Sequence, residues 1–318
     1  MSRPLFVARA CVAAPSLLLI SLLGSQNAQA HGFAGDRFFP ATITVDDPFV
    51  ADEMSLPTAS AIKNGDNIQE VDVSIEVSKR ITEHFGVSVG ENWTRLLHNA
   101  AGFQNLETTF QYQLITEAKS EFVFTVGFTT EWANTGAKGV GADNFNTYRP
   151  QIYFGKGFGD LPENFNLIRP FAITGQVGYA IPGLGKTVSL TFDPATQNFD
   201  REVDQHARNL NWGLTLQYSL PYLNSHVQAI EGPGKEFLQR LIPLVEASFT
   251  TPVSNFSGPQ VTTGTINPGV IWAGQWTQFG VEAMIPVNRE SGHGVGVIAQ
   301  AHFYLDDIFP TTIGKPLF

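Results

Sequence analysis

The sequence contains very little cysteine and little charge. Among 318 residues the only cysteine is Cys11, and Asp, Glu, Lys and Arg together make up 15%. A single cysteine excludes an internal disulfide framework. Soluble proteins carry charge on roughly a quarter of their residues, so this fraction argues against an ordinary soluble surface. The formal net charge of −10 also argues against nucleic acid as a partner, because phosphate binding needs a basic footprint.

Long apolar runs are missing as well. The run from Ala13 to Leu23 is shorter than the about 20 residues of a transmembrane helix, and no later run is long enough. Arg3 and Arg9 precede this run, and Ala28-Gln29-Ala30 follows it as a small-x-small cleavage site. We therefore predict that residues 1–30 are a signal peptide that is cleaved on export. Cleavage would remove Cys11 and take the formal charge from −10 to −12.

The remaining sequence shows repeated alternation of apolar and polar residues. In Glu121 to Trp132, for example, Phe122, Phe124 and Phe128 stand at every second or fourth position. This period of two is typical of a β-strand whose faces meet different media. Eleven such segments occur: 69–80, 85–94, 105–114, 121–132, 147–158, 168–180, 209–220, 241–251, 265–274, 276–287 and 294–305. Each has about the length that a tilted strand needs to cross a bilayer.

A soluble β-sandwich would also alternate, but its outer faces would carry many Lys and Glu residues. Here the polar faces consist mostly of Gly, Ser, Thr, Asn and Gln, which suits a wet, enclosed lumen. Large aromatic residues near strand ends fit an aromatic girdle at the membrane interfaces: Trp93, Trp132, Tyr148, Tyr179, Trp212 and Trp272. We therefore predict an all-β fold, a transmembrane antiparallel up-and-down β-barrel of about 12 strands, with 10 or 14 as alternatives.

The predicted barrel occupies residues 68–305 and is flanked by two other segments. Residues 31–67 look irregular, and we expect them to supply a lumen plug and, at Ala41 to Phe49, the twelfth strand. Residues 306–318 are expected to form a periplasmic tail. Outer-membrane barrels have short periplasmic turns and long outer loops, so Ile181 to Arg208 is assigned to the outside. Pro221 to Arg240 is an exception, a long periplasmic connector with a short helix near its end.

Several charged residues fall on the predicted inner face of the barrel. They are Asp72, Glu76, Glu107, Glu121, Arg149, Glu246 and Glu282. An excess of carboxylates in a lumen favours the passage of cations. The alternative is that these groups only pair with one another or with water inside the barrel.

Signals for enzymatic or metal chemistry are weak. His31 would become the N-terminal residue after cleavage and resembles a copper-chelating N-terminus, but the other histidines show no ligand spacing. Gly185-Lys186-Thr187 lacks the first glycine of a phosphate-binding loop. No serine has a histidine partner implied by spacing, although a phospholipase-like barrel remains an alternative. We predict no catalytic residues, no metal site and no cofactor.

Two stretches carry a family resemblance: Ala28 to Thr42 (AQAHGFAGDRFFPAT) and Asn211 to Ser219 (NWGLTLQYS). With them the chain resembles uncharacterised proteobacterial outer-membrane barrels and, more distantly, the MetA-pathway-of-phenol-degradation family. The resemblance implies a channel or transporter for small molecules, including hydrophobic, aromatic or cationic ones, in the outer membrane of a Gram-negative bacterium. Its expected partners are outer-membrane lipid, a solute and the barrel-assembly machinery. A structural barrel without a permeation role is the alternative.

Overall fold

The computed structural model describes residues 32–193 and 197–318; the predicted signal peptide and His31 lie outside this part. The strands of the barrel wall are β3 (Glu53–Lys63), β4 (Gln69–Arg80), β5 (Phe85–Leu96), β7 (Glu107–Glu117), β8 (Phe122–Glu131), β9 (Thr147–Gly157), β10 (Phe171–Pro182), β13 (Arg208–Tyr218), β14 (Leu241–Ser254), β15 (Thr263–Ala273), β16 (Thr277–Pro286) and β17 (His293–Tyr304). The short strands are β1 (Phe33–Ala34), β2 (Arg37–Phe38), β6 (Ala100–Phe103), β11 (Lys186–Asp193) and β12 (Asn198–Gln205). The helices are α1 (Leu220–His226), α2 (Lys235–Leu238) and α3 (Leu305–Ile308), with 3-10 turns η1 (Ala118–Ser120), η2 (Lys138–Val140) and η3 (Glu163–Phe165).

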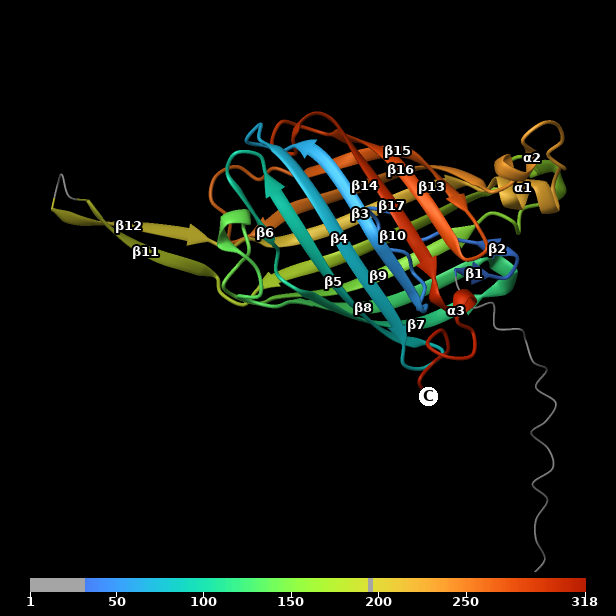
Figure 1. The fold of residues 1–318 in the computed structure, drawn as a ribbon, viewed down its shortest axis with the longest axis horizontal. Coiled ribbons are helices and arrows are strands. Elements are labelled where there is room, and N and C mark those ends of the chain that lie inside the picture. Colours follow the sequence, from blue (N-terminus) through green and yellow to red (C-terminus); the bar gives the residue numbers. More distant parts are fainter. Residues whose placement is uncertain (1–31, 194–196) are drawn as a thin grey trace, which may run out of the picture.

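The twelve long strands form one closed antiparallel barrel (Figure 1). Each strand pairs with its neighbours along the chain, and β17 pairs with β3 to close the ring. The predicted fold class is therefore confirmed. All eleven strands predicted from alternation are present, within a few residues of their expected bounds.

The outer surface of the barrel wall is apolar. Phe110 faces Phe128 across β7 and β8, and these side chains are 40% and 41% exposed. Ile152 and Val281, on β9 and β16, are exposed to a similar degree. Hydrocarbon tolerates no unpaired backbone groups and no exposed sheet edge, and a closed barrel with an apolar outer face satisfies both conditions. Among the described residues, no helix is long and apolar enough to span a membrane.

The first strand of the barrel is Glu53–Lys63, and the prediction of a strand at Ala41 to Phe49 was wrong. The barrel wall consequently begins at residue 53 and not at residue 68. Alternation failed to reveal β3 because its pairing with both neighbours shifts between Ser55 and Thr58, around Leu56 and Pro57. Such a bulge puts Ser55 and Thr58 on the same face and breaks the period of two.

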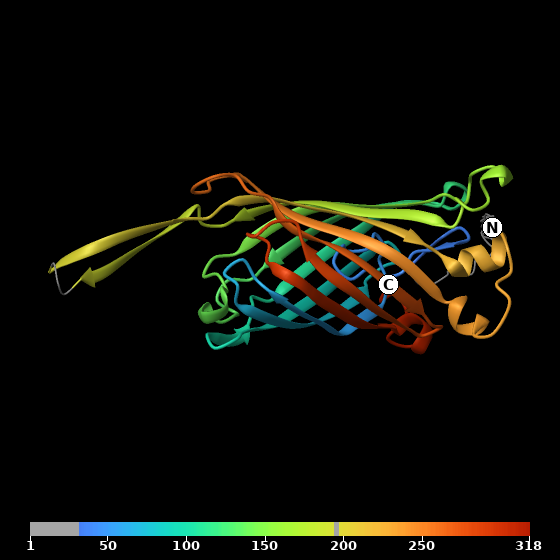
Figure 2. The same ribbon diagram turned by 90° about the horizontal axis from the view of Figure 1, so that it is seen from above.

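The two ends of the barrel differ (Figures 1 and 2). At one end the hairpin of β11 and β12 projects far beyond the wall. At the other end lie α1, α2, α3, the β1–β2 hairpin and the C-terminus. In the long connector after β13, α2 lies where the sequence indicated a short helix, and α1 is a second helix that was not predicted. We refer below to the hairpin end and the helical end.

Candidate functional site

The lumen contains residues 32–52, which we call the plug. Its centre is held by Glu246, on β14, which is fully buried. The Glu246 carboxylate accepts hydrogen bonds from the backbone N–H groups of Ile43 (2.9 Å), Thr44 (2.6 Å) and Val45 (2.9 Å), and from the Thr44 hydroxyl. In a β-strand these backbone N–H groups would donate to the carbonyl groups of a neighbouring strand. Here they donate to the Glu246 carboxylate, so they are satisfied without strand pairing.

The barrel wall is shaped to fit the plug. A Cβ atom at Gly213 would lie 2.8 Å from a methyl group of Val45, and a Cβ atom at Gly280 would lie 2.7 Å from the Ile43 side chain. Glycine at these inward positions therefore lets the plug approach the wall closely. On the opposite side, Gln113 accepts a hydrogen bond from the backbone N–H of Val50 (3.1 Å).

The N-terminal part of the plug is fixed by a buried ion pair. Arg37, which has no exposed surface, donates from Nε to Glu121 Oε2 (3.1 Å) and from Nη1 to the carbonyl oxygen of Pro170 (3.0 Å). Its guanidinium carbon also lies 3.8 Å from the centroid of the Tyr222 ring. Burial lowers the pKa of Arg37, and the charge of Glu121 opposes this shift.

The C-terminal part of the plug is tied to the wall through Asp52. This buried carboxylate accepts hydrogen bonds from Nε (2.7 Å) and the backbone N–H (2.9 Å) of Arg80. Arg80 also donates to the carbonyl oxygen of Gly314 (3.0 Å), so the C-terminal tail is attached at the same point. Side chains therefore hold the plug at its N-terminal part, its centre and its C-terminal part, and Gln113 adds a contact at Val50.

The structure brings all seven sequence-predicted lumen residues to the inner side or the helical rim of the barrel. Glu246 and Glu121 hold the plug, as described. Arg149 Nη2 pairs with Glu107 Oε2 at 3.3 Å. Asp72 accepts hydrogen bonds from Thr94 and Asn92 on the neighbouring β5, Glu76 lines a cavity described below, and Glu282 is 1% exposed.

The six predicted girdle residues divide between the two ends. Trp132, Tyr148 and Trp212 are 41%, 37% and 38% exposed. Together with Trp93 and Tyr179 they lie toward the hairpin end of their strands. Trp272 alone lies at the helical end, where its ring stacks near Phe237 and Phe279.

Cavities lie on both sides of the plug. Toward the hairpin end, one of about 500 Å³ is lined by residues such as Asp72 and Glu107, and another of about 340 Å³ by Arg149 and His206. At the helical end, a more apolar cavity of about 670 Å³ is lined by Phe38 and Tyr222, among others. The plug thus stands between two cavities toward the hairpin end and one cavity at the helical end.

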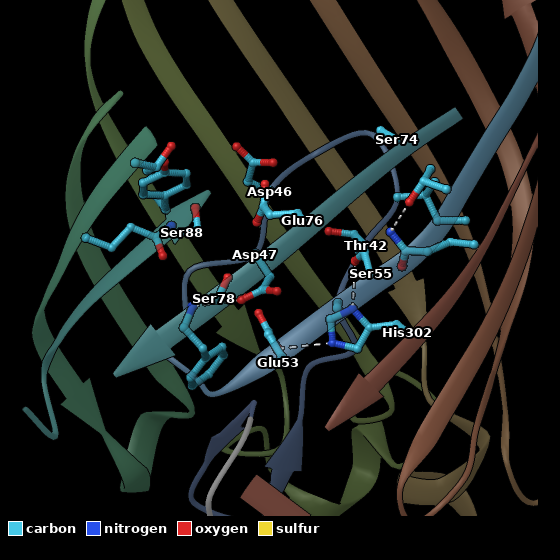
Figure 3. A pocket seen from close by; sticks show the side chains of 18 residues that line it. Thr42, Asp46, Asp47, Glu53, Ser55, Ser74, Glu76, Ser78, Ser88 and His302 are labelled. Atoms are coloured by element: carbon cyan, nitrogen blue, oxygen red, sulfur yellow. Dashed lines mark hydrogen bonds and ion pairs between the residues drawn. The ribbon is translucent and has the colours of Figure 1, made fainter. Parts of the chain in front are cut away.

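One constellation in the lumen has no counterpart in the sequence pattern. His302, on the last strand β17, contacts Ser55 Oγ through Nδ1 (2.9 Å) and Glu53 Oε2 through Nε2 (3.1 Å), both on the first strand β3 (Figure 3). The residues are about 250 positions apart in the chain, so no spacing indicates their contact. They join the two strands that close the barrel.

The Ser55, His302 and Glu53 side chains resemble a hydrolase triad in composition, but their surroundings do not suit hydrolysis. Serine hydrolases bond the serine to Nε2 of the histidine, whereas here it is bonded to Nδ1. The carboxylates of Asp47 and Glu76 line the same cavity. They would repel the oxyanion that an ester hydrolase must stabilise.

No family model matches the chain, and no curated protein matches it either. Solved structures of barrels do match. An outer-membrane channel from Pseudomonas putida F1 is 10% identical, with a TM-score of 0.51, over 84% of this chain and 99% of that chain. The KdgM porin and the NanC porin are 11% and 7% identical, with TM-scores of 0.47 and 0.46, over 79% of this chain and 98% of each. At such identities the likeness shows the fold alone.

Proposed function

We propose that the protein is an outer-membrane channel for small molecules whose passage is closed by the plug and opens when the plug moves. One observation carries this proposal: the plug lies across the lumen between cavities at the hairpin end and a cavity at the helical end. A barrel with a purely structural role would need no cavities on either side of the plug. Twelve strands give an interior between the filled eight-stranded and the open sixteen-stranded barrels.

The way in which the plug is attached supports movement. Only β1 and β2 pair within the plug, and they pair with each other and not with the wall. The attachments at Glu246, Arg37 and Asp52 involve side chains, which can be released without breaking a strand ladder. The closed wall would then stay intact while the lumen opens.

The membrane setting follows from the proposed role. The apolar outer face would contact outer-membrane lipid, with the helical end in the periplasm and the β11–β12 hairpin outside. Insertion would need the barrel-assembly machinery, and an exported chain would reach it through the periplasm. The polar lumen suits water-soluble solutes, and the acidic side chains that line it favour cations over anions. The MetA-pathway resemblance implies uptake of aromatic compounds, and the apolar lining that would suit them is at the helical end, in the cavity lined by Phe38 and Tyr222.

The proposal is tested by solute flux into proteoliposomes. Two proteins are compared: the full chain, and a variant in which residues 33–50 are replaced by a Gly/Ser linker of equal length. All twelve wall strands remain in this variant, because the first begins at Glu53. We expect the variant to admit small sugars and amino acids much faster than the full chain. A barrel that stays sealed in both forms would contradict the proposal and favour the structural role.

A further inference from the structure

The cavity beside the plug carries a strong excess of negative charge. It has a volume of about 160 Å³, and Figure 3 draws its 18 lining side chains. Four of them are carboxylates: Asp46 and Asp47 from the plug, and Glu53 and Glu76 from the wall. None of the lining residues is Lys or Arg. The nearest counter-charge noted for Asp46 is Arg149, which lies outside the cavity lining and is paired with Glu107.

A second feature also indicates a missing donor. Gln300, on β17, lines the same cavity and is only 8% exposed. Its Nε2 donates to the Thr58 hydroxyl (3.0 Å), but its buried Oε1 accepts no hydrogen bond. A buried acceptor without a donor costs about 1–3 kcal/mol, and a ligand with N–H groups would remove that cost. A cation that carries N–H groups would therefore satisfy both the carboxylates and the amide oxygen of this cavity.

The arrangement of the carboxylates distinguishes between kinds of cation. In Figure 3 the four acidic side chains follow one another along the cavity from Asp46 to Glu53 and do not converge on one point. Within residues 32–193 and 197–318, no three His, Cys, Asp or Glu side chains are placed to hold one metal ion. An elongated ligand with two separated charges suits this row better. The volume is comparable to that of a cavity that holds benzene, about 150 Å³.

We propose that this cavity binds a small aliphatic diammonium ion, with one ammonium group near each end of the row of carboxylates, and that the bound ion holds the plug closed. Half of the acidic groups belong to the plug and half to the wall, so the complete site exists only while the plug is in place. A ligand that binds one state only stabilises that state by mass action. This inference rests on the proposed function, because closure has meaning only for a channel.

Burial and neighbouring charge both affect the carboxyl groups of this cavity. Burial raises the pKa of Asp47 well above its usual value, and the charges of Glu53, Asp46 and Glu76 raise it further. Burial is the larger cause and the neighbouring carboxylates the smaller one, and a dication between the carboxylates would oppose the smaller one.

The test is isothermal titration of the purified full chain in detergent with 1,4-diaminobutane. We expect saturable binding that Asp47→Asn and Glu76→Gln each weaken by about tenfold or more, the loss of one charge-assisted hydrogen bond. Gln300→Met, which changes no charge, should weaken it several-fold. Asp72→Asn is the matched control, since it removes a lumen charge that does not line the cavity, and should change affinity less than twofold. Uncharged 1,4-butanediol should not bind.

Two results would overturn the site. The first is that Asp72→Asn weakens binding as much as Asp47→Asn does, which would indicate a diffuse lumen potential. The second is that Mg²⁺ alone binds as tightly as the diamine. Flux separates this proposal from the channel proposal. If the linker variant admits solutes but the full chain binds no diamine, the site is wrong and the channel stands. If the full chain binds diamine but the linker variant stays sealed, the site stands and the channel is wrong.

Discussion

Replacement of Glu246 by alanine should open the channel, because this carboxylate is the central attachment of the plug. It receives three backbone N–H groups and one hydroxyl of Ile43, Thr44 and Val45. Alanine offers none of these acceptors. Apart from the methylene groups that are lost, the substitution leaves the wall pairing of β14 with β13 and β15 in place.

The expected size of the effect follows from the hydrogen bonds. A hydrogen bond to a charged group contributes about 1.5–3 kcal/mol. Glu246→Ala removes four such hydrogen bonds, and water that enters the lumen would form some of them again with the freed plug donors. If the net loss equals about two such bonds at the lower value, the docked plug is destabilised by about 3 kcal/mol. At 1.4 kcal/mol per tenfold change, the ratio of open to closed plug should rise by about 100-fold.

The assay is single-channel recording in planar bilayers at fixed salt and pH. We expect the open probability of Glu246→Ala to exceed that of the unmodified protein by one to two orders of magnitude, up to saturation. Asp72→Asn is the control, because Asp72 accepts its hydrogen bonds from wall residues such as Thr94 and Asn92. If Glu246→Ala opens no more often than Asp72→Asn, the plug is not held in the way described here.

Three further predictions concern other parts of the plug and the barrel seam. The pKa of Asp47 is raised, by burial first and then by Glu53. Docking of the plug is therefore most favourable below the usual pKa of an aspartate, and it becomes less favourable as the pH rises through the raised pKa of Asp47. The open probability should increase from acidic to neutral pH, and a decrease would contradict this. Arg37→Met leaves its carboxylate partner buried and unpaired, at a cost of about 3–5 kcal/mol, and should accelerate hydrogen exchange in residues 33–50, whereas unchanged exchange would exclude the ion pair as an attachment. His302→Ala removes two hydrogen bonds between the first and last strands and should destabilise the barrel by about 2–4 kcal/mol, which a lower temperature of the heat-induced mobility shift would show. The control is Val295→Ala, on the same strand, whose side chain is 69% exposed; it should leave that temperature nearly unchanged.

The sequence predicts the barrel wall well because the wall depends on a local pattern. Eleven strands have one face in contact with lipid and the other with the lumen, and each therefore alternates along its own residues. β3 is the exception. Its alternation is interrupted at Leu56 and Pro57 by the bulge, and the acidic residues near its start resemble a loop. A pattern of period two cannot detect a strand whose period changes.

The contacts inside the lumen were beyond a reading of local pattern because their partners are far apart in the chain. The sequence indicates that Glu246 faces inward, but not that it binds backbone groups about 200 residues earlier. The same holds for His302 and Ser55, which only closure of the barrel brings together. Alternation places glycines such as Gly213 on the inner face, but it does not show that they make room for the plug.

The central claim is that solutes cross through the space that the plug occupies, and a reversible lock tests it most directly. The chain has no cysteine after Cys11, so Val45→Cys with Gly213→Cys introduces a unique pair of cysteines. A Cβ atom at position 213 would lie 2.8 Å from the side chain of Val45, which is close enough for a disulfide. We predict that the oxidised protein in a planar bilayer stays closed, and that dithiothreitol restores the conductance of the unmodified protein. Equal conductance before and after reduction, with the disulfide verified by mass spectrometry, would contradict the account.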